Sequence, residues 1–147
     1  MAGANFPVVI FHNPECGTSP NVLAIIMAAG YSPTIIDYMI EGWTRGQLLA
    51  LFAAADVTPR EALREKNTPA KDLGLINNSV GEEALIESMI EHPILVNRPF
   101  VATPKGVKLC RPDSGMVLDL LQRWPNGPFA KEDGVLLIDA DGNRVRE

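Results

Sequence analysis

The chain of 147 residues is predicted to be an α/β protein with a mixed sheet and a helical insertion between the two halves of the fold. Three observations predict this class. Short apolar runs, typical of strands buried on both faces, flank a helical pattern near the N-terminus. About sixty residues with only helical patterns follow. Two strand patterns and a further helix come next, so the expected order is β-α-β, helices, β-β-α.

The first half has the pattern of a β-α-β unit. Continuous apolar residues predict one strand at 8–11 and a second at 34–38. Between them, Thr18 and Ser19 are good N-caps, apolar residues follow helical spacing, and Gly30 suits the C-terminal cap. Because helical crossovers join parallel strands, we expect a right-handed parallel unit.

The helical insertion, at about residues 41–92, has three segments. Thr44 and Gln47 have the spacing of a capping box, which predicts the start of the first helix. A proline then opens a short helical segment at about 59–67, and a longer helix is predicted at 80–91. The residues expected on the inward face of that longer helix are Ala84, Leu85, Ile86, Met89 and Ile90.

The last part of the chain completes the sheet. Strands at 100–103 and 107–110 flank a Pro-Lys-Gly turn, which predicts a hairpin. A helix capped by aspartate is expected at 113–121, and an apolar strand at 135–138. Without the insertion, this order is the connectivity of a thioredoxin-like domain, here one domain spanning residues 1–147.

Composition and charge narrow the classes of function. The 18 acidic and 13 basic residues give a formal net charge of −5, which argues against nucleic acids and anionic membrane surfaces as partners. A small anion can still bind, because a local cluster of basic residues can oppose the net sign. The two cysteines are too few for a disulfide scaffold, and no metal site is expected. Without a targeting pattern or an apolar run of about 20 residues, we expect a cytoplasmic monomer with reduced thiols.

Cys16 is the candidate nucleophile, because it lies between a strand end and a helix start in the sequence His-Asn-Pro-Glu-Cys-Gly-Thr-Ser at 12–19. Helix N–H groups at such a position lower a thiol pKa into the range of about 3.5–7.5 and also bind oxyanions. The alternative is a small buried hydrophobe. Ser19 stands where a dithiol protein has its second cysteine. An external thiol is therefore expected to resolve an oxidised Cys16, which indicates glutathione and a glutaredoxin.

Other polar side chains have two interpretations each. As an imidazolium, His12 favours a nearby thiolate, or it merely ends the strand. Ser19 caps the helix, or it also donates to the thiolate or an anion. Cys110 is expected to pack in a strand rather than to resolve Cys16.

Three arginines are candidates for binding an oxyanion. Arg98 and Arg111 each precede a proline, and Arg64 lies at the end of the short helical segment. Guanidinium groups match tetrahedral oxyanions with two parallel hydrogen bonds. The alternative for each arginine is a surface ion pair.

Three motifs at these separations resemble the glutaredoxin-dependent arsenate reductases. They are His-Asn-Pro-x-Cys-Gly-Thr-Ser at 12–19, His-Pro-Ile-Leu-Val-Asn-Arg-Pro at 92–99 and Leu-Cys-Arg-Pro at 109–112. The sequence departs from the family pattern at two positions where many members have arginine, namely Pro20, directly after the first motif, and Lys108, in the strand predicted at 107–110.

The resemblance implies that Cys16 attacks arsenic(V) and that His12 helps to lower the pKa of its thiol. The arginines that it implies for binding and activating arsenate are Arg64, Arg98 and Arg111. The other expected substrate contacts are Asn13, Gly17, Thr18 and Ser19. Pro99 corresponds to the cis-proline that faces the cysteine in thioredoxin folds.

The resemblance also implies glutathione as co-substrate with no bound cofactor, glutaredoxin as partner, and a thioarsenate intermediate that ends in arsenite. Two other classes of function remain open. One is a thioredoxin-like regulator that docks on a protein through the helical insertion. The other is a thiol-dependent reductase of another substrate, or a phosphatase-like thiol site.

Overall fold

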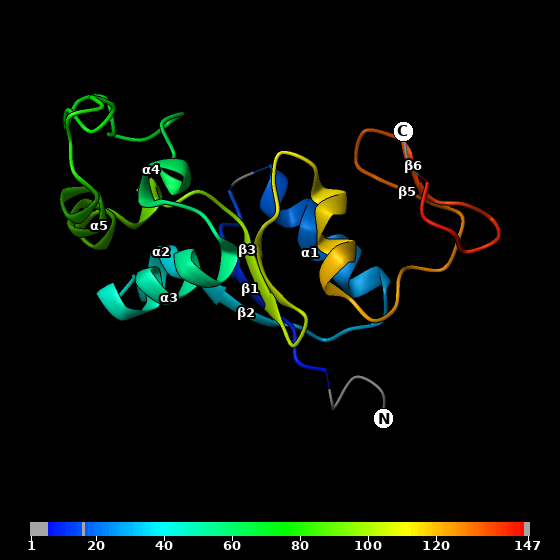
Figure 1. Ribbon diagram of the computed structural model, residues 1–147. Coiled ribbons are helices and arrows are strands. Elements are labelled where there is room, and N and C mark those ends of the chain that lie inside the picture. Colours follow the sequence, from blue (N-terminus) through cyan, green and yellow to red (C-terminus); the bar gives the residue numbers. More distant parts are fainter. Residues whose placement is uncertain (1–5, 16, 146–147) are drawn as a thin grey trace. The chain divides into compact units, whose positions relative to one another are not determined.

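The computed structural model describes residues 6–15 and 17–145 (Figure 1). The chain divides into two compact units. We call residues 1–36 and 98–147 the sheet unit and residues 37–97 the helical unit. The predicted insertion at about 41–92 falls within the helical unit. The single domain over the whole chain stays a prediction.

The main sheet has four strands, in the order β2-β1-β3-β4 (Figure 1). They are β1 (Val9–His12), β2 (Thr34–Asp37), β3 (Phe100–Thr103) and β4 (Gly106–Leu109). Helix α1 (Thr18–Ala28) connects β1 with its neighbour β2, which is the crossover that a parallel pair requires. β3 is antiparallel to both β1 and β4. The predicted thioredoxin-like α/β class is confirmed, with strand boundaries shifted by about one residue from the sequence pattern.

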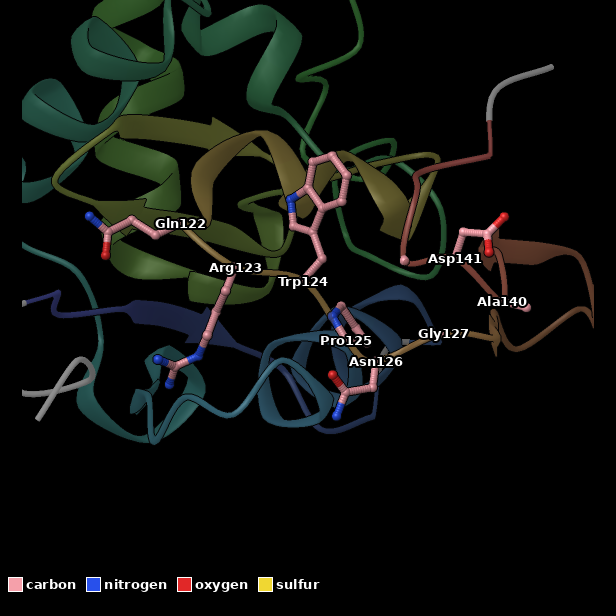
Figure 2. A pocket seen from close by; sticks show the side chains of 9 residues that line it. Gln122, Arg123, Trp124, Pro125, Asn126, Gly127, Ala140 and Asp141 are labelled. Atoms are coloured by element: carbon pink, nitrogen blue, oxygen red, sulfur yellow. The ribbon is translucent and has the colours of Figure 1, made fainter.

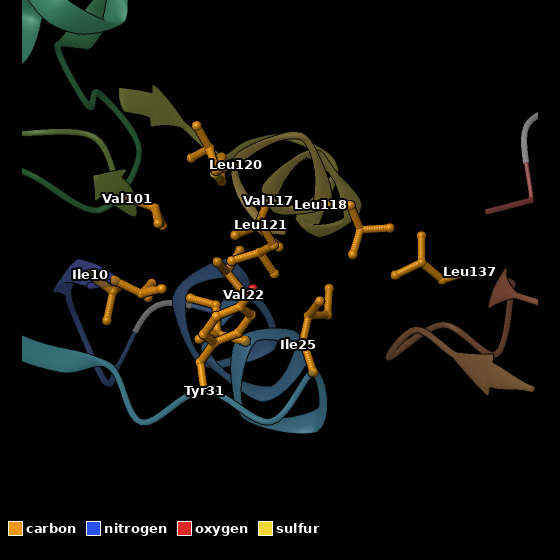
Figure 3. Close-up of a cluster of buried hydrophobic side chains, with 14 of the residues drawn as sticks. Ile10, Val22, Ile25, Tyr31, Val101, Val117, Leu118, Leu120, Leu121 and Leu137 are labelled. Carbon is orange, nitrogen blue, oxygen red and sulfur yellow. The ribbon is translucent and has the colours of Figure 1, made fainter. Parts of the chain in front are cut away.

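The core of the sheet unit lies between the sheet and two helices. The second helix, η3 (Ser114–Leu120), packs against α1. Figure 3 shows Ile10, Val22, Val101 and Leu118 of this apolar cluster. The predicted aspartate cap is confirmed, since the Asp113 carboxylate accepts the Gly115 N–H at 2.9 Å. The helix is a 3₁₀ helix that ends at Leu120, rather than an α-helix to Leu121, and its flanking bonds link residues three apart.

The two ends of α1 differ in how their backbone groups are capped. The N-cap is Gly17, so the prediction that Thr18 or Ser19 caps the helix is wrong. At the other end, Gly30 has the positive φ of 93° that the sequence predicts for a helix stop. The Arg123 guanidinium donates to the carbonyl oxygens of Ala29 and Gly30, at 2.8 and 2.7 Å.

The helical unit contains four α-helices and a 3₁₀ turn. They are α2 (Tyr38–Glu41), α3 (Arg45–Ala55), α4 (Pro59–Ala62), α5 (Glu82–Glu91) and η2 (Pro93–Leu95). The predicted capping box is confirmed, because Thr44 Oγ1 accepts the Gln47 N–H and the Gln47 side chain accepts the Thr44 N–H. Within the described ranges, no helix has both the length and the hydropathy that a bilayer crossing requires.

Two helix predictions in this unit are wrong in detail. α4 ends at Ala62 instead of near 66–67, because Leu63 turns extended and forms an antiparallel bridge with Val96. α5 begins at Glu82, and its buried residues are Leu85, Ile86 and Met89. Ala84 and Ile90 are exposed instead, because they lie at the two margins of this narrow buried face.

The chain ends in a small antiparallel hairpin of β5 (Phe129–Ala130) and β6 (Leu136–Ile138). The sequence predicts β6 but not β5, because two residues carry no alternating pattern. Ion pairs join this segment to the residues around η3. Lys131 lies 3.0 Å from Asp113, and Arg144 lies 2.5 Å from Asp119. The Gly115 N–H and then Lys131 lower the pKa of Asp113.

Substituting Gly127 with alanine is expected to destabilise the sheet unit. A Cβ at this position overlaps the backbone carbonyl of Asp139, which cannot move without displacing the β5–β6 hairpin. Overpacking of this kind costs about 1–3 kcal/mol in the free energy of unfolding, which urea denaturation measures.

The matched control is Gly46→Ala in α3, where no atom of the described residues lies within 4 Å of an added Cβ. It is expected to be neutral or slightly stabilising, since alanine favours a helix interior over glycine. Equal stability of the two variants contradicts the close approach at Gly127.

Candidate active site

The strand register brings the predicted motifs of the sheet unit to one edge of the sheet. Phe11 of β1 lies opposite Phe100 of β3, and Phe100 also lies opposite Leu109 of β4. Because both pairs are antiparallel, the end of β1, the start of β3 and the end of β4 leave the sheet on the same side. The Cys110 N–H extends this ladder by donating to the Pro99 carbonyl at 2.9 Å.

Two of the predicted arginines meet at this edge. Arg98 is only 5% exposed, which excludes the alternative of a solvated surface ion pair. The Arg111 guanidinium is half-buried, and its Nη1 donates to the Arg98 carbonyl oxygen at 2.9 Å. The peptide bonds Arg98–Pro99 and Arg111–Pro112 are both cis. The cis-proline expected at Pro99 is confirmed, whereas the sequence analysis did not identify the second one, although the same Arg-Pro pair marks it.

A buried hydrogen-bond cluster links the end of β1 with the first turn of α1. Ser19 is fully buried, and its Oγ lies 2.7 Å from His12 Nδ1. The same oxygen accepts the Asn13 N–H at 3.1 Å. The Asn13 side chain in turn accepts the Glu15 N–H at 3.0 Å. The loop before α1 is therefore fixed by its own polar side chains.

The sequence analysis did not predict the contact between His12 and Ser19. A spacing of seven residues across a strand end, a loop and a helix start has no fixed geometry. The histidine in the last strand position and the serine in the first helical turn are the only sequence signals of this contact.

Residues 17–20 place no charged or bulky side chain at the start of α1. Gly17 is exposed, and an added Cβ there would meet nothing within 4 Å among the described residues. No side chain in the described part of the chain caps this helix. Thr18 is half-buried, and Pro20 in the first turn supplies neither an N–H nor a charge. Cys16, the predicted nucleophile, lies outside the described residues.

Arg64 belongs to the helical unit and is described with it. Its N–H donates to the Leu95 carbonyl at 2.7 Å, and its Nε donates to the Lys66 carbonyl at 3.2 Å. The Thr68 hydroxyl donates to the Arg64 carbonyl oxygen at 2.6 Å. These bonds fix the segment that follows α4, while a contact of Arg64 with substrate stays a prediction.

Cys110 is a core residue. Its side chain is fully buried in the apolar cluster of the sheet unit, and its Sγ lies 3.8 Å from the Lys108 carbonyl oxygen. Burial raises the pKa of the Cys110 thiol to about 12. A thiol in this state is not a nucleophile near neutral pH.

A surface groove with a volume of 540 Å³ lies elsewhere in the sheet unit (Figure 2). It is lined by residues 122–127 and 140–142 and contains no predicted site residue. Its Arg123 already holds the end of α1 and lies 4.5 Å from the centre of the Tyr31 ring. The arginine of this groove therefore has a structural role, and we do not assign the groove as the active site.

The edge formed by the ends of β1, β3 and β4 can bind a small oxyanion. It combines the buried Arg98, an Arg111 guanidinium that donates to the Arg98 carbonyl oxygen, and the N-terminus of α1. Guanidinium and helix N–H groups are donors that tetrahedral anions accept. His12 adds an imidazole held by a hydroxyl.

Comparisons with known proteins agree with this interpretation. The model of the ArsC family matches residues 11–116. The chain is 62% identical over 138 residues to the arsenate reductase ArsI2 of Synechocystis sp. PCC 6803, covering 94% of this chain and 98% of that protein. It is 51% identical over 138 residues to an arsenate reductase of Rhizobium meliloti, with the same coverage.

Among solved structures, an arsenate reductase from Vibrio cholerae superposes with a TM-score of 0.73 at 32% identity. The match covers 79% of this chain and 98% of that one. A structure from Yersinia pestis described as a putative arsenate reductase gives a TM-score of 0.70 at 28% identity, covering 76% of this chain and 98% of that one.

Alkylation of the native protein with iodoacetamide near neutral pH is expected to label one thiol and to leave Cys110 unmodified, because its raised pKa and burial keep it protonated and inaccessible. Mass spectrometry of peptides measures the label on each cysteine. In denaturant both cysteines are expected to react, which serves as the control. Native labelling of Cys110 at a rate close to that in denaturant contradicts its place in the core.

Proposed function

Because the chain belongs to the ArsC family, we propose that it reduces arsenate to arsenite with electrons from glutathione and glutaredoxin. Its similarity to proteins named arsenate reductases supports the substrate. The structure supports the proposal through one observation. Arg98, Arg111 and the N-terminus of α1 lie at the same edge of the sheet.

The proposed reaction has four steps. The Cys16 thiolate attacks arsenic(V), and an S–As bond replaces one oxygen, which leaves as water after protonation. A glutathione thiol replaces a second oxygen in the same way. A glutaredoxin thiolate then attacks the glutathionyl sulfur and breaks its bond to arsenic. The bonding electron pair stays on arsenic, which becomes arsenic(III), and a glutaredoxin–glutathione mixed disulfide forms. Water finally breaks the Cys16–arsenic(III) bond, releasing arsenite and the thiol.

The scheme assigns a role to several of the described residues. Arg98 and Arg111 neutralise the arsenate dianion and draw electron density from arsenic, which favours attack by the thiolate. The N–H groups at the start of α1 stabilise the Cys16 thiolate and hold an arsenate oxygen. Asn13 keeps the loop before Cys16 in place through its bond with the Glu15 N–H. Arg64 is the third arginine that the resemblance to arsenate reductases implies for arsenate binding.

The electron donor follows from the position of the cysteines. Ser19 has no thiol, and Cys110 is buried in the core with its pKa raised to about 12. Ser19 therefore cannot form a disulfide with Cys16, and the buried, protonated thiol of Cys110 is not expected to do so. We therefore propose that reduced glutathione of the cytoplasm supplies the electrons. We also expect the chain to act as a monomer without a bound cofactor.

A coupled assay tests this function. Purified protein, glutathione, glutaredoxin and glutathione reductase are expected to oxidise NADPH only when arsenate is present, with release of free arsenite. Cys16→Ser is expected to abolish turnover, whereas Cys110→Ser is the matched control that retains most of it. Absence of arsenate-dependent turnover, together with Cys16 alkylation that arsenate does not slow, contradicts the proposal. Inorganic phosphate released from an ester would instead indicate a phosphatase.

Truncation of Arg111 to alanine is expected to lower kcat/KM for arsenate by about tenfold to a hundredfold, which corresponds to the loss of one charge-assisted hydrogen bond. Arg98→Lys is expected to act in the same direction, because lysine keeps the charge but loses the planar fork. Steady-state kinetics with varied arsenate measures both effects.

The control for these two variants is Arg45→Ala. Arg45 is an exposed residue of the helical unit that pairs with Glu83, and its loss is expected to change kcat/KM less than about twofold. Kinetics like those of the unmodified protein in both Arg111→Ala and Arg98→Lys contradict the role of these arginines.

A further inference from the structure

We propose that the C-terminal hairpin, residues 129–145, holds the Arg111 segment, residues 108–114, in place, with Lys131 and Arg144 as its positioning residues. No residue of this hairpin takes part in the proposed reaction. The meaning of the proposal for arsenate binding rests on the proposed function. The connection between the two segments rests on contacts within the sheet unit.

The first connection joins the hairpin to the chain that follows Arg111. Oδ1 of Asp113 caps η3 and also lies 3.0 Å from Lys131 Nζ. The next residue, Ser114, is buried, and its hydroxyl donates to the Glu132 carboxylate at 2.9 Å. Two consecutive residues, the first of them two positions after Arg111, are therefore bound to two consecutive residues of the hairpin.

The second connection joins the hairpin to the strand that precedes Arg111. The two carboxylate oxygens of Asp119 pair with different cations. Oδ2 lies 3.5 Å from Nζ of Lys108 in β4, and Oδ1 lies 2.5 Å from Nη1 of Arg144. Arg111 thus lies in the chain between Lys108 and Asp113. Both of these residues are linked to the hairpin, the first through a shared carboxylate and the second directly.

The hairpin backbone and the apolar core fix the two cations. Leu137 of β6 is buried in the core of the sheet unit (Figure 3). Its Cδ1 packs against the start of η3, where it would lie 2.9 Å from a Cβ added to Gly115. Arg144 forms an antiparallel bridge with Ile138, and the Lys131 N–H donates across the hairpin turn at 2.9 Å. Both cations therefore extend from backbone that is itself held in place.

These ion pairs differ from ordinary surface pairs in the burial of their cations. Surface pairs contribute little, because water screens them and because two long side chains lose their freedom. The side chains of Lys131 and Arg144 are each only 14% exposed, so packing of their stems already limits that freedom. A guanidinium that binds an anion must be held within a fraction of an ångström, so a modest loosening of the Arg111 segment is expected to weaken arsenate binding.

Hydrogen exchange tests the connection in the absence of substrate. The backbone N–H groups of Cys110 and Arg111 donate to carbonyl oxygens at 2.9 and 3.0 Å. In a variant that combines Lys131→Met with Arg144→Met, these two amides are expected to exchange about two- to tenfold faster. The amides of α5 in the helical unit are the internal reference and are expected to stay unchanged. Unchanged exchange at both residues, or the same acceleration in α5, overturns the proposal.

The titration of Asp113 reports the ion pair with Lys131. The Gly115 N–H, against the opposing effect of burial, and then Lys131 lower the pKa of this carboxyl. In Lys131→Met, the pKa of Asp113 is expected to rise toward its usual value, which an NMR titration of the side-chain carboxyl carbon measures. Lys131→Arg keeps the charge and is expected to restore both the low pKa and the slow amide exchange. An Asp113 pKa that is the same in Lys131→Met as in the unmodified protein overturns the direct connection.

Kinetics test the meaning for arsenate. Lys131→Met is expected to raise KM for arsenate about two- to fivefold and to change kcat less than about twofold, because looser binding acts before the chemical step. The matched control is Lys105→Met, which also removes a cation from the sheet unit. Nζ of Lys105 donates to the Leu121 carbonyl oxygen at 3.3 Å, beyond the end of η3, and its loss is expected to change KM less than about 1.5-fold.

The outcomes separate this proposal from the proposed function. Equal KM values in Lys131→Met and Lys105→Met, or faster exchange of the Arg111 amide with an unchanged KM, overturn the positioning role. Absence of arsenate reduction by the unmodified protein contradicts the proposed function instead. Amide exchange and the Asp113 titration then still decide whether the hairpin holds the Arg111 segment, because neither measurement contains arsenate.

Discussion

The antiparallel register of β1, β3 and β4 is the constraint on which the candidate site depends. Phe11, Phe100 and Leu109 share one row of the sheet, so three chain segments leave it at the same edge. One residue of slippage in either pair would turn alternate side chains to the opposite face of the sheet and expose the core. The apolar contacts of Ile10 and Val101 with α1 and η3 oppose such slippage (Figure 3). Burial of the core thus also fixes the positions of the polar groups.

Hydrogen bonds link the polar groups at this edge to one another. Arg111 binds the carbonyl of Arg98, and Ser19 joins the end of β1 to the first turn of α1. Buried polar groups are stable only when their hydrogen bonds are satisfied, so each contact limits the positions of its neighbours. The arsenate that we propose to bind here would meet donors that are already oriented. Such preorganisation is the main source of electrostatic stabilisation in enzymes.

Local signals in the sequence predict the parts of the fold that depend on local geometry. The capping box of Thr44 and Gln47 and the helix stop at Gly30 are examples, because each involves residues within one turn. Contacts between distant segments were not predictable. α4 ends early because Leu63 pairs with Val96. Ser19 lies inside α1, whose N-cap is Gly17, and its hydroxyl contacts His12 and Asn13. Arg98 and Arg111 were identified from the prolines that follow them, but only the structure shows that the Arg111 guanidinium contacts the Arg98 carbonyl oxygen.

A crystal structure of the protein soaked with arsenate, or with sulfate as its analogue, tests the central claim most directly. The account predicts a tetrahedral anion at the edge where β1, β3 and β4 end, within hydrogen-bond distance of Arg98 and Arg111 and of the first N–H groups of α1. Anion density confined to the groove lined by residues 122–127 and 140–142, with none at that edge, would contradict it.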